Sequence, residues 1–162
     1  MIKKIISGGQ TGVDRAALDV AIELNIPHGG WIPMGRLTED GPLPEEYQLK
    51  EMSEASYPKR TERNVMDSDG TLIISRGLPT GGTAYTIEMA RKHEKPYILI
   101  NPEERSEPDA PSIICSWIQK KGIEVLNVAG PRASEDSGIY RSTRNILEKI
   151  YRMGIIIEDK KR

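Results

Sequence analysis

The sequence predicts an α/β protein in which a mostly parallel sheet is covered by helices on both faces. Short apolar runs alternate with segments of helical periodicity along the chain. Glycine-rich turns follow several of the apolar runs, as is typical where a buried strand leads into a helix. Strands separated by helix-length segments are joined by crossover connections, so they lie parallel and need cover on both faces.

The composition is that of one soluble globular domain. The 162 residues are 37% hydrophobic, and no stretch approaches the roughly 18 continuous apolar residues of a membrane span. With 23 basic and 24 acidic side chains the formal net charge is -1, which provides no polycationic field for nucleic acid. We expect one domain over residues 1–157, a flexible tail over 158–162, and neither a membrane nor a nucleic-acid partner.

The few cysteine and histidine residues restrict redox and metal chemistry. The single cysteine, Cys115, cannot form an internal disulfide, and its apolar neighbours indicate a core residue. His28 and His93 are far apart in the sequence, so they do not have the spacing of a zinc site. Glycines interrupt the first apolar run before a signal peptide could form. The sequence therefore favours a cytoplasmic protein without a metal centre.

The first part of the chain predicts two strands, two helices and a long loop. An apolar strand over 2–7 precedes a helix over 13–24, whose apolar residues recur at helical spacing. A short strand over 28–32 follows. Residues 33–58 lack periodicity and are rich in glycine, proline and charge, which is more typical of a functional lid or binding loop than of a simple connection. A short helix over 61–67 comes next.

The second part alternates regularly between strands and helices, with a proline-rich loop near its middle. Together with the first part, this order predicts a three-layer, doubly wound Rossmann-like fold. Strands are expected over 70–75, 96–100 and 124–128, and helices over 84–93, 112–121 and 136–153.

A first glycine-rich loop over residues 8–12 lies where the first strand leads into the first helix. Its glycines leave backbone N–H groups open to an anion, and the helix N-terminus adds partial positive charge. The pattern G-G-x-x-G is neither the dinucleotide fingerprint nor a Walker A loop. A tight structural turn is the alternative, and Thr11 with Asp14 fits a capping box.

A second loop, Thr80–Thr83, repeats this arrangement after another apolar strand. In a doubly wound sheet, ligands bind at the carboxyl ends of the strands, where neighbouring strands send their helices to opposite faces. If the strands that end at Ser7 and Ser75 are neighbours, both loops face one crevice. The pair of loops therefore favours a phosphate-bearing or otherwise anionic ligand.

Arginines near these loops have two interpretations. Arg63 and Asn64 share a helix face with Arg60 and Asp67, which could line the same cleft. The alternative is a solvent-exposed Arg63–Asp67 pair. Arg132 follows a Gly-Pro pair at the end of the last strand, where it either clamps a phosphate or remains a solvated loop residue.

An ordered set of motifs runs over nearly the whole chain. The set consists of GGQTGVDRAALD at 8–19, HGGW at 28–31, EDGP at 39–42, RNV at 63–65, TGGT at 80–83 and NVAGPR at 127–132. It resembles the molybdenum carrier protein family, a branch of the Rossmann-like group that includes the lysine-decarboxylase-like or lonely-guy proteins.

The resemblance implies a parallel α/β fold, homo-oligomers and binding of the molybdenum cofactor (molybdopterin) or a related phosphorylated ligand, with molybdoenzymes as recipients. By position, the phosphate-binding role falls on residues 8–12 and 80–83. The candidate cofactor-binding residues are Gly8, Gly9, Gln10, Thr11, Gly12, Arg15, Arg63, Asn64, Thr80, Gly81, Gly82, Thr83 and Arg132.

One departure separates the chain from the lonely-guy phosphoribohydrolases. Those enzymes carry a catalytic glutamate three residues after the threonine of Pro-Gly-Gly-x-Gly-Thr-x-x-Glu. Here position 86 is Thr86, and Glu88 stands five residues after Thr83. On a helix this rotates the carboxylate by roughly 200° from position 86. Their N-glycosidase activity is therefore not carried over.

The sequence favours a binding or carrier protein for a phosphorylated cofactor, in which the two loops hold the phosphate and residues 33–58 shield the rest. No catalytic residue is assigned. The alternatives are a hydrolase of nucleotides or nucleotide metabolites, with Asp40, Asp67 or Glu88 activating water, and a nucleotide sensor without turnover.

Overall fold

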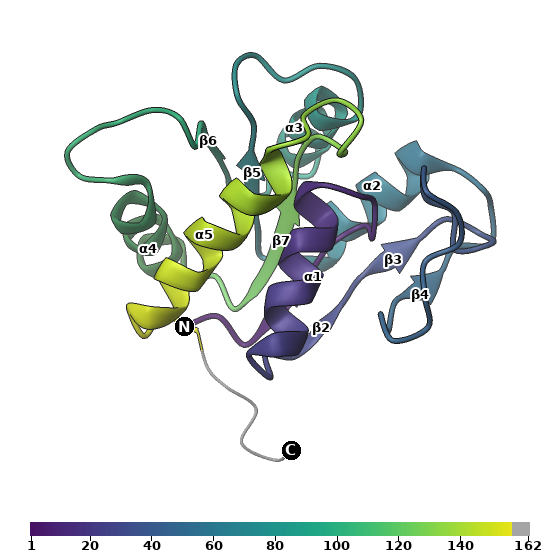
Figure 1. Ribbon diagram of the computed structural model, residues 1–162, viewed down its shortest axis with the longest axis horizontal. Helices are drawn as coiled ribbons and strands as arrows, with labels where there is room; N and C mark the ends of the chain where they lie inside the picture. Colours follow the sequence, from purple (N-terminus) through teal and green to yellow (C-terminus); the bar gives the residue numbers. More distant parts are fainter. Residues whose placement is uncertain (157–162) are drawn as a thin grey trace.

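The computed structural model describes residues 1–156 and shows helices on both faces of a central sheet (Figure 1). The strands are β1 (Lys4–Ile6), β2 (His28–Gly29), β3 (Trp31–Ile32), β4 (Lys50–Glu51), β5 (Gly70–Ile74), β6 (Tyr97–Ile100) and β7 (Val125–Ala129). The helices are α1 (Val13–Glu23), α2 (Tyr57–Asp67), α3 (Gly81–Lys92), α4 (Ala110–Lys121) and α5 (Ile139–Arg152). The expected tail over 158–162 lies outside the described residues.

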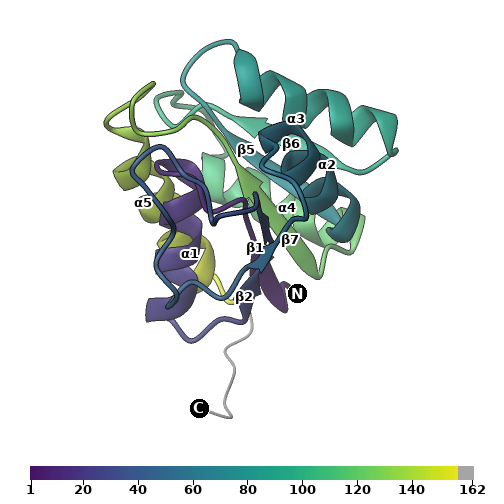
Figure 2. The ribbon, with the colours of Figure 1, turned by 90° about the vertical axis from the view of Figure 1, so that its right-hand side faces the viewer.

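The main sheet has the strand order β2–β1–β7–β5–β6, and every neighbouring pair in it is parallel. Helices α1, α4 and α5 cover one face, and α2 and α3 cover the other (Figure 2). The expected three-layer, doubly wound α/β class is therefore confirmed.

The two sides of the sheet are packed unequally. The largest apolar cluster fills the space between the sheet and helices α1, α4 and α5, with Leu72, Ile114 and Leu147 fully buried in it. The α2 and α3 side has a smaller cluster, formed by Val65, Met89 and Ala90 with partly buried tyrosines beside them. This side therefore leaves room near the strand ends.

Four helices begin at positions other than those expected from periodicity, among them α4, which begins at Ala110 instead of 112. Helix α2 begins at Tyr57 instead of 61, because the Ser56 side chain accepts a hydrogen bond from the Lys59 N–H at 3.2 Å and a proline occupies the first turn. Helix α3 begins at Gly81 instead of 84, and α5 at Ile139 instead of 136. In α2, α3 and α4 the first turn contains glycine or proline and carries no apolar periodicity, whereas α5 begins later than expected because Gly138 is its N-cap.

The single strand expected over 28–32 is two strands in two sheets. Gly30 separates them with a φ of 122°, and a Cβ there would lie 2.2 Å from the Ser7 carbonyl oxygen. Strand β2 pairs with β1 in the main sheet, whereas β3 leaves it and pairs with β4. A backbone conformation that favours glycine thus directs the chain out of the main sheet.

Residues 33–56 form an ordered segment that packs against α1. Leu43, Tyr47 and Leu49 make a small apolar cluster with Leu18 of α1. The Arg36 guanidinium holds the turns by donating hydrogen bonds to backbone carbonyls, among them Tyr47 at 2.7 Å and Leu43 at 2.8 Å. The segment is therefore ordered by hydrogen bonds from one side chain, although its sequence has no helical or strand periodicity.

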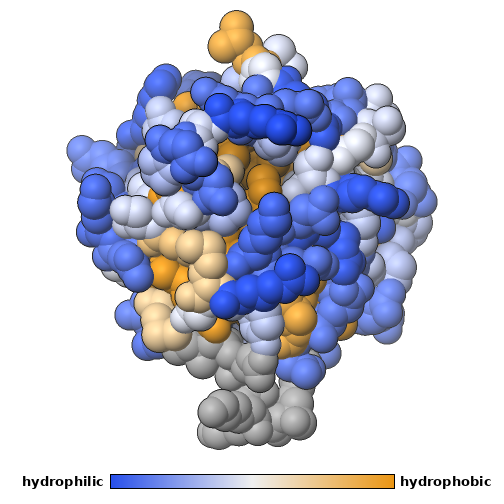
Figure 3. Space-filling view, turned by 60° about the vertical axis from the view of Figure 1, so that its left-hand side comes forward, coloured by the Kyte–Doolittle hydropathy of each residue, from blue (hydrophilic) through white to orange (hydrophobic). Residues whose placement is uncertain are grey.

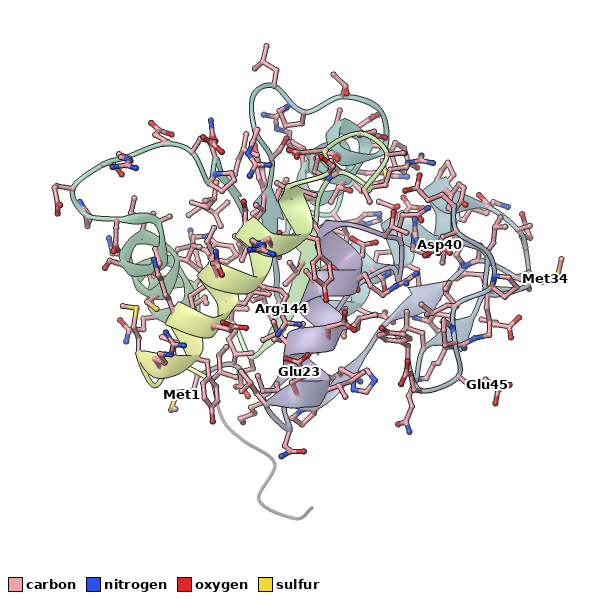
Figure 4. The ribbon with its side chains drawn as sticks, in the orientation of Figure 1. Met1, Glu23, Met34, Asp40, Glu45 and Arg144 are labelled. Carbon is pink, nitrogen blue, oxygen red and sulfur yellow. The ribbon has the colours of Figure 1, made fainter. Side chains whose placement is uncertain are left out.

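Polar contacts join the elements that surround α1. Arg144 of α5 donates to both carboxylate oxygens of Glu23 at the end of α1, and Figure 4 shows the two side chains meeting between these helices. Asp19 accepts hydrogen bonds from Tyr47 at 2.6 Å and Tyr140 at 2.5 Å. Helix α1 is therefore fixed to both α5 and the 33–56 segment.

The described surface bears on the expected partners. Within residues 1–156, no helix combines the length and the apolar character needed to cross a membrane. On the face that carries α4, hydrophilic side chains predominate and the apolar ones lie in separate small areas (Figure 3). The expected homo-oligomer stays a prediction.

Replacing Gly130 with alanine is expected to destabilise the fold. The new Cβ would lie 2.3 Å from the Ile74 carbonyl oxygen and 2.6 Å from Val13 Cγ2, so β5 or α1 would have to move. Overpacking of this kind costs about 1–3 kcal/mol of unfolding free energy, measurable by urea unfolding. Gly82→Ala is the control, because a Cβ there meets nothing within 4 Å. Equal stability of the two variants would contradict the close packing at Gly130.

Candidate functional site

A cavity of about 380 Å³ opens at the carboxyl ends of the strands, on the upper side of the molecule in Figure 1. Its walls come from the β1–α1 loop, α2, the first turns of α3, the end of β7 and the β7–α5 loop. The lining residues are Gly8, Gln10, Asp14, Tyr57, Pro58, Arg60, Thr61, Asn64, Gly81, Gly82, Thr83, Tyr85, Thr86, Asn127, Ala129, Gly130, Pro131, Arg132 and Glu135.

The two glycine loops line this one cavity although their strands are not neighbours. The condition that the strands ending at Ser7 and Ser75 pair directly is wrong, because β7 lies between β1 and β5. The helices after β1 and β7 cover one face, and the helix after β5 covers the other. The switch point therefore lies between β7 and β5, and β7 forms the floor of the cavity.

The N-terminus of α3 presents unused hydrogen-bond donors to the cavity. Thr80 is the N-cap, and its side chain makes no capping bond. Among the described residues, the N–H groups of Gly81 and Gly82 have no hydrogen-bond partner. Thr83 is 6% exposed, and its hydroxyl likewise has none in residues 1–156. Free N–H groups at a helix N-terminus attract anions, so this turn is suited to a phosphate.

A buried arginine from α2 reaches the first glycine loop. Arg60 is 7% exposed, and its guanidinium donates to the Gly8 carbonyl oxygen. A Cβ at Gly8 would lie 2.5 Å from Arg60 Nη1, so glycine is the residue that leaves room for this contact. Burial lowers the pKa of the guanidinium, against the opposing attraction of Asp14. A positive charge is thus held at the cavity wall.

Asp14 places a buried carboxyl in the same cavity. Its side chain is held by the Gln10 N–H, which donates to Asp14 Oδ2 at 3.3 Å. Burial raises the pKa of Asp14 from 3.8 to about 6, and the attraction of Arg60 opposes that rise. Both charge states of this group are therefore populated within a pH unit or so of neutrality.

The capping box expected from Thr11 and Asp14 is wrong. Gly12 is the N-cap of α1 and no side chain caps it. Instead, the Thr11 hydroxyl donates to Glu39 and accepts a hydrogen bond from the Ala133 N–H at 3.0 Å. Thr11 therefore joins the first glycine loop to the β7–α5 loop.

Glu39 fastens the 33–56 segment to the loop that carries Arg132. Its carboxylate accepts hydrogen bonds from the Ser134 N–H at 3.1 Å and the Ser134 hydroxyl at 2.6 Å. Burial acts to raise the pKa of Glu39, but the bonds from Ser134 and Thr11 outweigh it and keep that pKa below its usual value. We refer to Glu39, Thr11 and Ser134 as the Glu39 clasp.

Two arginines flank one aromatic ring on the cavity wall. The guanidinium carbons of Arg60 and Arg132 lie 5.4 Å and 5.8 Å from the centre of the Tyr57 ring. Arg132 also pairs with Glu135 at 3.2 Å, and its side chain is 38% exposed. Because both guanidinium groups lie over this ring, Tyr57 holds two positive charges at the cavity wall, an arrangement that suits a ligand with an anionic group.

The structure brings seven of the thirteen candidate residues to the cavity and places six behind or beside it. Asn64 is among the seven, but its amide is engaged with the Trp31 backbone, at 2.8 Å to the N–H and 3.1 Å to the carbonyl. The seven lining residues are Gly8, Gln10, Asn64, Gly81, Gly82, Thr83 and Arg132. The six that do not line it are Gly9, Thr11, Gly12, Arg15, Arg63 and Thr80.

Several of these six residues support the site from outside the cavity. Arg15 donates to the Gly9 carbonyl and to Asp40, each at 3.3 Å, which holds the first loop. A Cβ at Gly12 would lie 2.3 Å from the Pro131 carbonyl oxygen. Arg63 lies over the Trp31 ring and pairs with Asp67 at 3.5 Å, as in the solvent-exposed interpretation.

The acids proposed for a hydrolase do not line the cavity. Asp40 accepts from the Thr38 hydroxyl at 2.6 Å, Asp67 accepts from the Trp31 indole at 2.7 Å, and Glu88 is not among the lining residues. The cavity acids are Asp14 and Glu135 instead. Within residues 1–156, no group of three or more His, Cys, Asp or Glu side chains could hold a metal ion.

Several lining residues are not among the candidates from the sequence, and four of them carry polar or aromatic groups that the site uses. Of the 33–58 segment, Tyr57 and Pro58 line the cavity. Arg60 had a signal, its place on the same helix face as Asn64, whereas nothing in the sequence marks Asp14 as buried. The four residues are Asp14, Tyr57, Arg60 and Asn127.

Fold and site define a Rossmann-like α/β protein with a cavity at the switch point of its sheet. The chain belongs to the circularly permutated YpsA SLOG family (cpYpsA), whose family model matches residues 5–151. It is 55% identical to a protein from Syntrophus aciditrophicus SB with a known crystal structure, described as a "Putative molybdenum carrier protein". The TM-score is 0.89, and the match covers 92% of this chain and 94% of that one. The expected resemblance to molybdenum carrier proteins is confirmed. No curated protein matches the chain.

Asp14 is expected to make stability fall as pH rises. The folded protein keeps a proton on this group between pH 3.8 and about 6 that the unfolded chain has lost. The contribution of Asp14 to the free energy of unfolding is therefore greatest below pH 4, and about 3 kcal/mol of it is lost as pH rises past 6. Urea unfolding at pH 4 and pH 7 should show this loss in the wild type relative to Asp14→Asn.

The control for this comparison is Asp67→Asn, which removes a half-exposed carboxylate outside the cavity. It should retain the wild-type dependence on pH. Parallel pH profiles for the wild type and Asp14→Asn would contradict a buried, proton-retaining Asp14.

Proposed function

We propose that the protein binds and carries a phosphorylated cofactor, with the molybdenum cofactor (molybdopterin) as the best candidate. The observation that carries the proposal is the unpaired N-terminus of α3 in the same cavity as Arg60 and Arg132. Phosphate oxygens accept hydrogen bonds from both kinds of donor, and charge-assisted bonds of this type are among the strongest in proteins.

The size and walls of the cavity suit a cofactor that also contains a planar ring. Its volume of about 380 Å³ lies in the ordinary range for small-molecule sites. Tyr57 and Tyr85 supply aromatic surface, and Ala129 with Gly130 leaves the floor free of bulky side chains. A pterin ring has the shape for such a slot. The description of the Syntrophus relative as a molybdenum carrier supports molybdopterin in particular.

This proposal also covers the setting in which the protein works. We infer that it acts in the cytoplasm as a homo-oligomer and passes the cofactor to molybdoenzymes. It needs no protein nucleophile, since the two loops and the arginines only hold the ligand. Small-molecule binding of this kind is compatible with a formal net charge of -1.

A hydrolase of nucleotide-derived metabolites is the second candidate, favoured by Asp14. A cavity carboxyl whose pKa is raised to about 6 suits general acid–base work near neutral pH. Release of base from a nucleoside monophosphate would be the signature of this activity. Binding without such release supports the carrier or a nucleotide sensor.

Protein purified from a host that makes molybdenum cofactor should contain pterin and molybdenum in similar amounts. The first is measured by fluorescence after oxidation and the second by elemental analysis. Protein from a host that lacks the cofactor is the control. Absence of both components, together with rapid release of base from a nucleoside monophosphate, would overturn the carrier proposal in favour of the hydrolase.

Arg132→Gln is expected to weaken binding of inorganic pyrophosphate by about tenfold or more, because a charge-assisted hydrogen bond contributes about 1.5–3 kcal/mol. Isothermal titration calorimetry measures the change. Arg63→Gln is the matched control, since that arginine lies outside the cavity over Trp31. Equal weakening in the two variants would show that general surface charge, not the cavity, attracts the anion.

A further inference from the structure

The cavity contains buried hydrogen-bond acceptors as well as donors. Asp14 is 8% exposed and Asn127, on the floor strand β7, is 3% exposed. The Asn127 amide nitrogen donates to Thr71 Oγ1 at 3.2 Å, and its Oδ1 accepts no hydrogen bond from any residue in 1–156. Among residues 1–156, Thr143 Oγ1 is the one fully buried polar side-chain atom without a hydrogen bond, so the unpaired Asn127 Oδ1 is open to the cavity and can accept a hydrogen bond from a ligand.

The Asp14 carboxylate also has acceptor capacity to spare. The backbone N–H groups of Gln10 and Gly8 are the donors near it, and it forms no ion pair within 4.0 Å among the described side chains. An ionised carboxyl offers about four lone-pair positions, so positions remain for a ligand. A phosphate cannot take them, because two negative groups in contact repel each other.

The donors and acceptors come from different parts of the cavity wall. The free N–H groups belong to α3 on one face of the sheet, and Asp14 belongs to α1 on the other. The phosphate therefore has its place at α3 and the arginines. What contacts Asp14 and Asn127 must be a part of the ligand that donates hydrogen bonds.

We propose that Asp14 and Asn127 select a ligand ring whose edge presents an amino group next to a ring N–H. This inference rests on the proposed binding of a phosphorylated ligand and names the chemistry of its other end. A carboxylate accepts two parallel hydrogen bonds from such an edge, as it does from a guanidinium. Guanine and pterin rings present this pair of donors, and Tyr85 of α3 adds an aromatic side chain to the cavity wall.

The charge of Asp14 makes this selection depend on pH. The charged or titratable groups around Asp14 and the cavity are Arg60 and Tyr57 from α2, Tyr85 from α3, Arg132 and Glu135 from the β7–α5 loop, and Arg15 beside Asp14 on α1. A protonated carboxyl can accept fewer hydrogen bonds than a carboxylate, and its O–H group is itself a donor. Preference for the amino-bearing ring is therefore expected to fade as pH falls through about 6.

The test compares GMP with IMP, which lacks only the amino group, and uses inorganic pyrophosphate as the probe for the anion alone. At pH 7.5 the wild type should bind GMP at least tenfold more tightly than IMP, and the ratio should approach one at pH 5. Asp14→Asn should reduce the ratio at pH 7.5 at least fivefold without weakening pyrophosphate binding. Asp67→Asn, a carboxylate outside the cavity, should keep the wild-type ratio.

Equal affinity for GMP and IMP in a wild type that binds pyrophosphate would overturn the selection by Asp14 and leave the anion site standing. A full preference for GMP in Asp14→Asn would overturn that selection as well. Failure of the wild type to bind pyrophosphate and both nucleotides would overturn the proposed function itself. Unfolding curves of Asp14→Asn at pH 7.5 establish that the variant is folded.

Discussion

The contact between the Arg60 guanidinium and the Gly8 carbonyl is the interaction on which the site depends. A buried guanidinium is costly unless hydrogen bonds and nearby negative charge offset the loss of water. Here the carbonyl of a residue without a Cβ lies directly against it, and Asp14 supplies the charge. The contact ties α2 to the β1–α1 loop across the end of the sheet. It also holds the positive charge of Arg60 at the cavity, because it directs this side chain of α2 toward the end of the sheet.

The strand order determines what kind of space lies beside this contact. Strand β7 stands between β1 and β5, and the helices that follow β7 and β5 leave on opposite faces. Ala129 and Gly130 at the end of β7 leave the cavity free of large side chains on this strand. A Cβ at Gly130 would meet the neighbouring strand β5. The α2 and α3 layer packs through a smaller apolar cluster than the opposite layer. A cavity at this point thus follows from topology and from residue size together.

The sequence was sufficient for the fold class, for the order of the main elements and for the places of the two glycine-rich loops between strand and helix, because apolar periodicity and glycine position are local signals. It was insufficient where the outcome depends on distant contacts. The conformation of Gly30, which splits one expected strand into two, is set by its packing on Ser7. Asp14 and Arg60 have the polar character of surface residues, and only the tertiary structure buries them together. Arg63 shows the converse, since it shares a helix with Arg60 but lies outside the cavity.

The Glu39 clasp gives the 33–56 segment a part in the site that its position does not suggest. Met34 and Glu45 point outward at the far side of this segment, whereas Asp40 lies toward α1 (Figure 4). The outer turn is held by the Arg36 guanidinium, which donates to the Pro44 and Tyr47 carbonyls, and the other side of the segment is hydrogen-bonded to the loop that carries Arg132. Through Tyr47, which donates to Asp19 of α1, and Glu39, which accepts from Ser134, the 33–56 segment links the position of α1 to the position of the loop that carries Arg132.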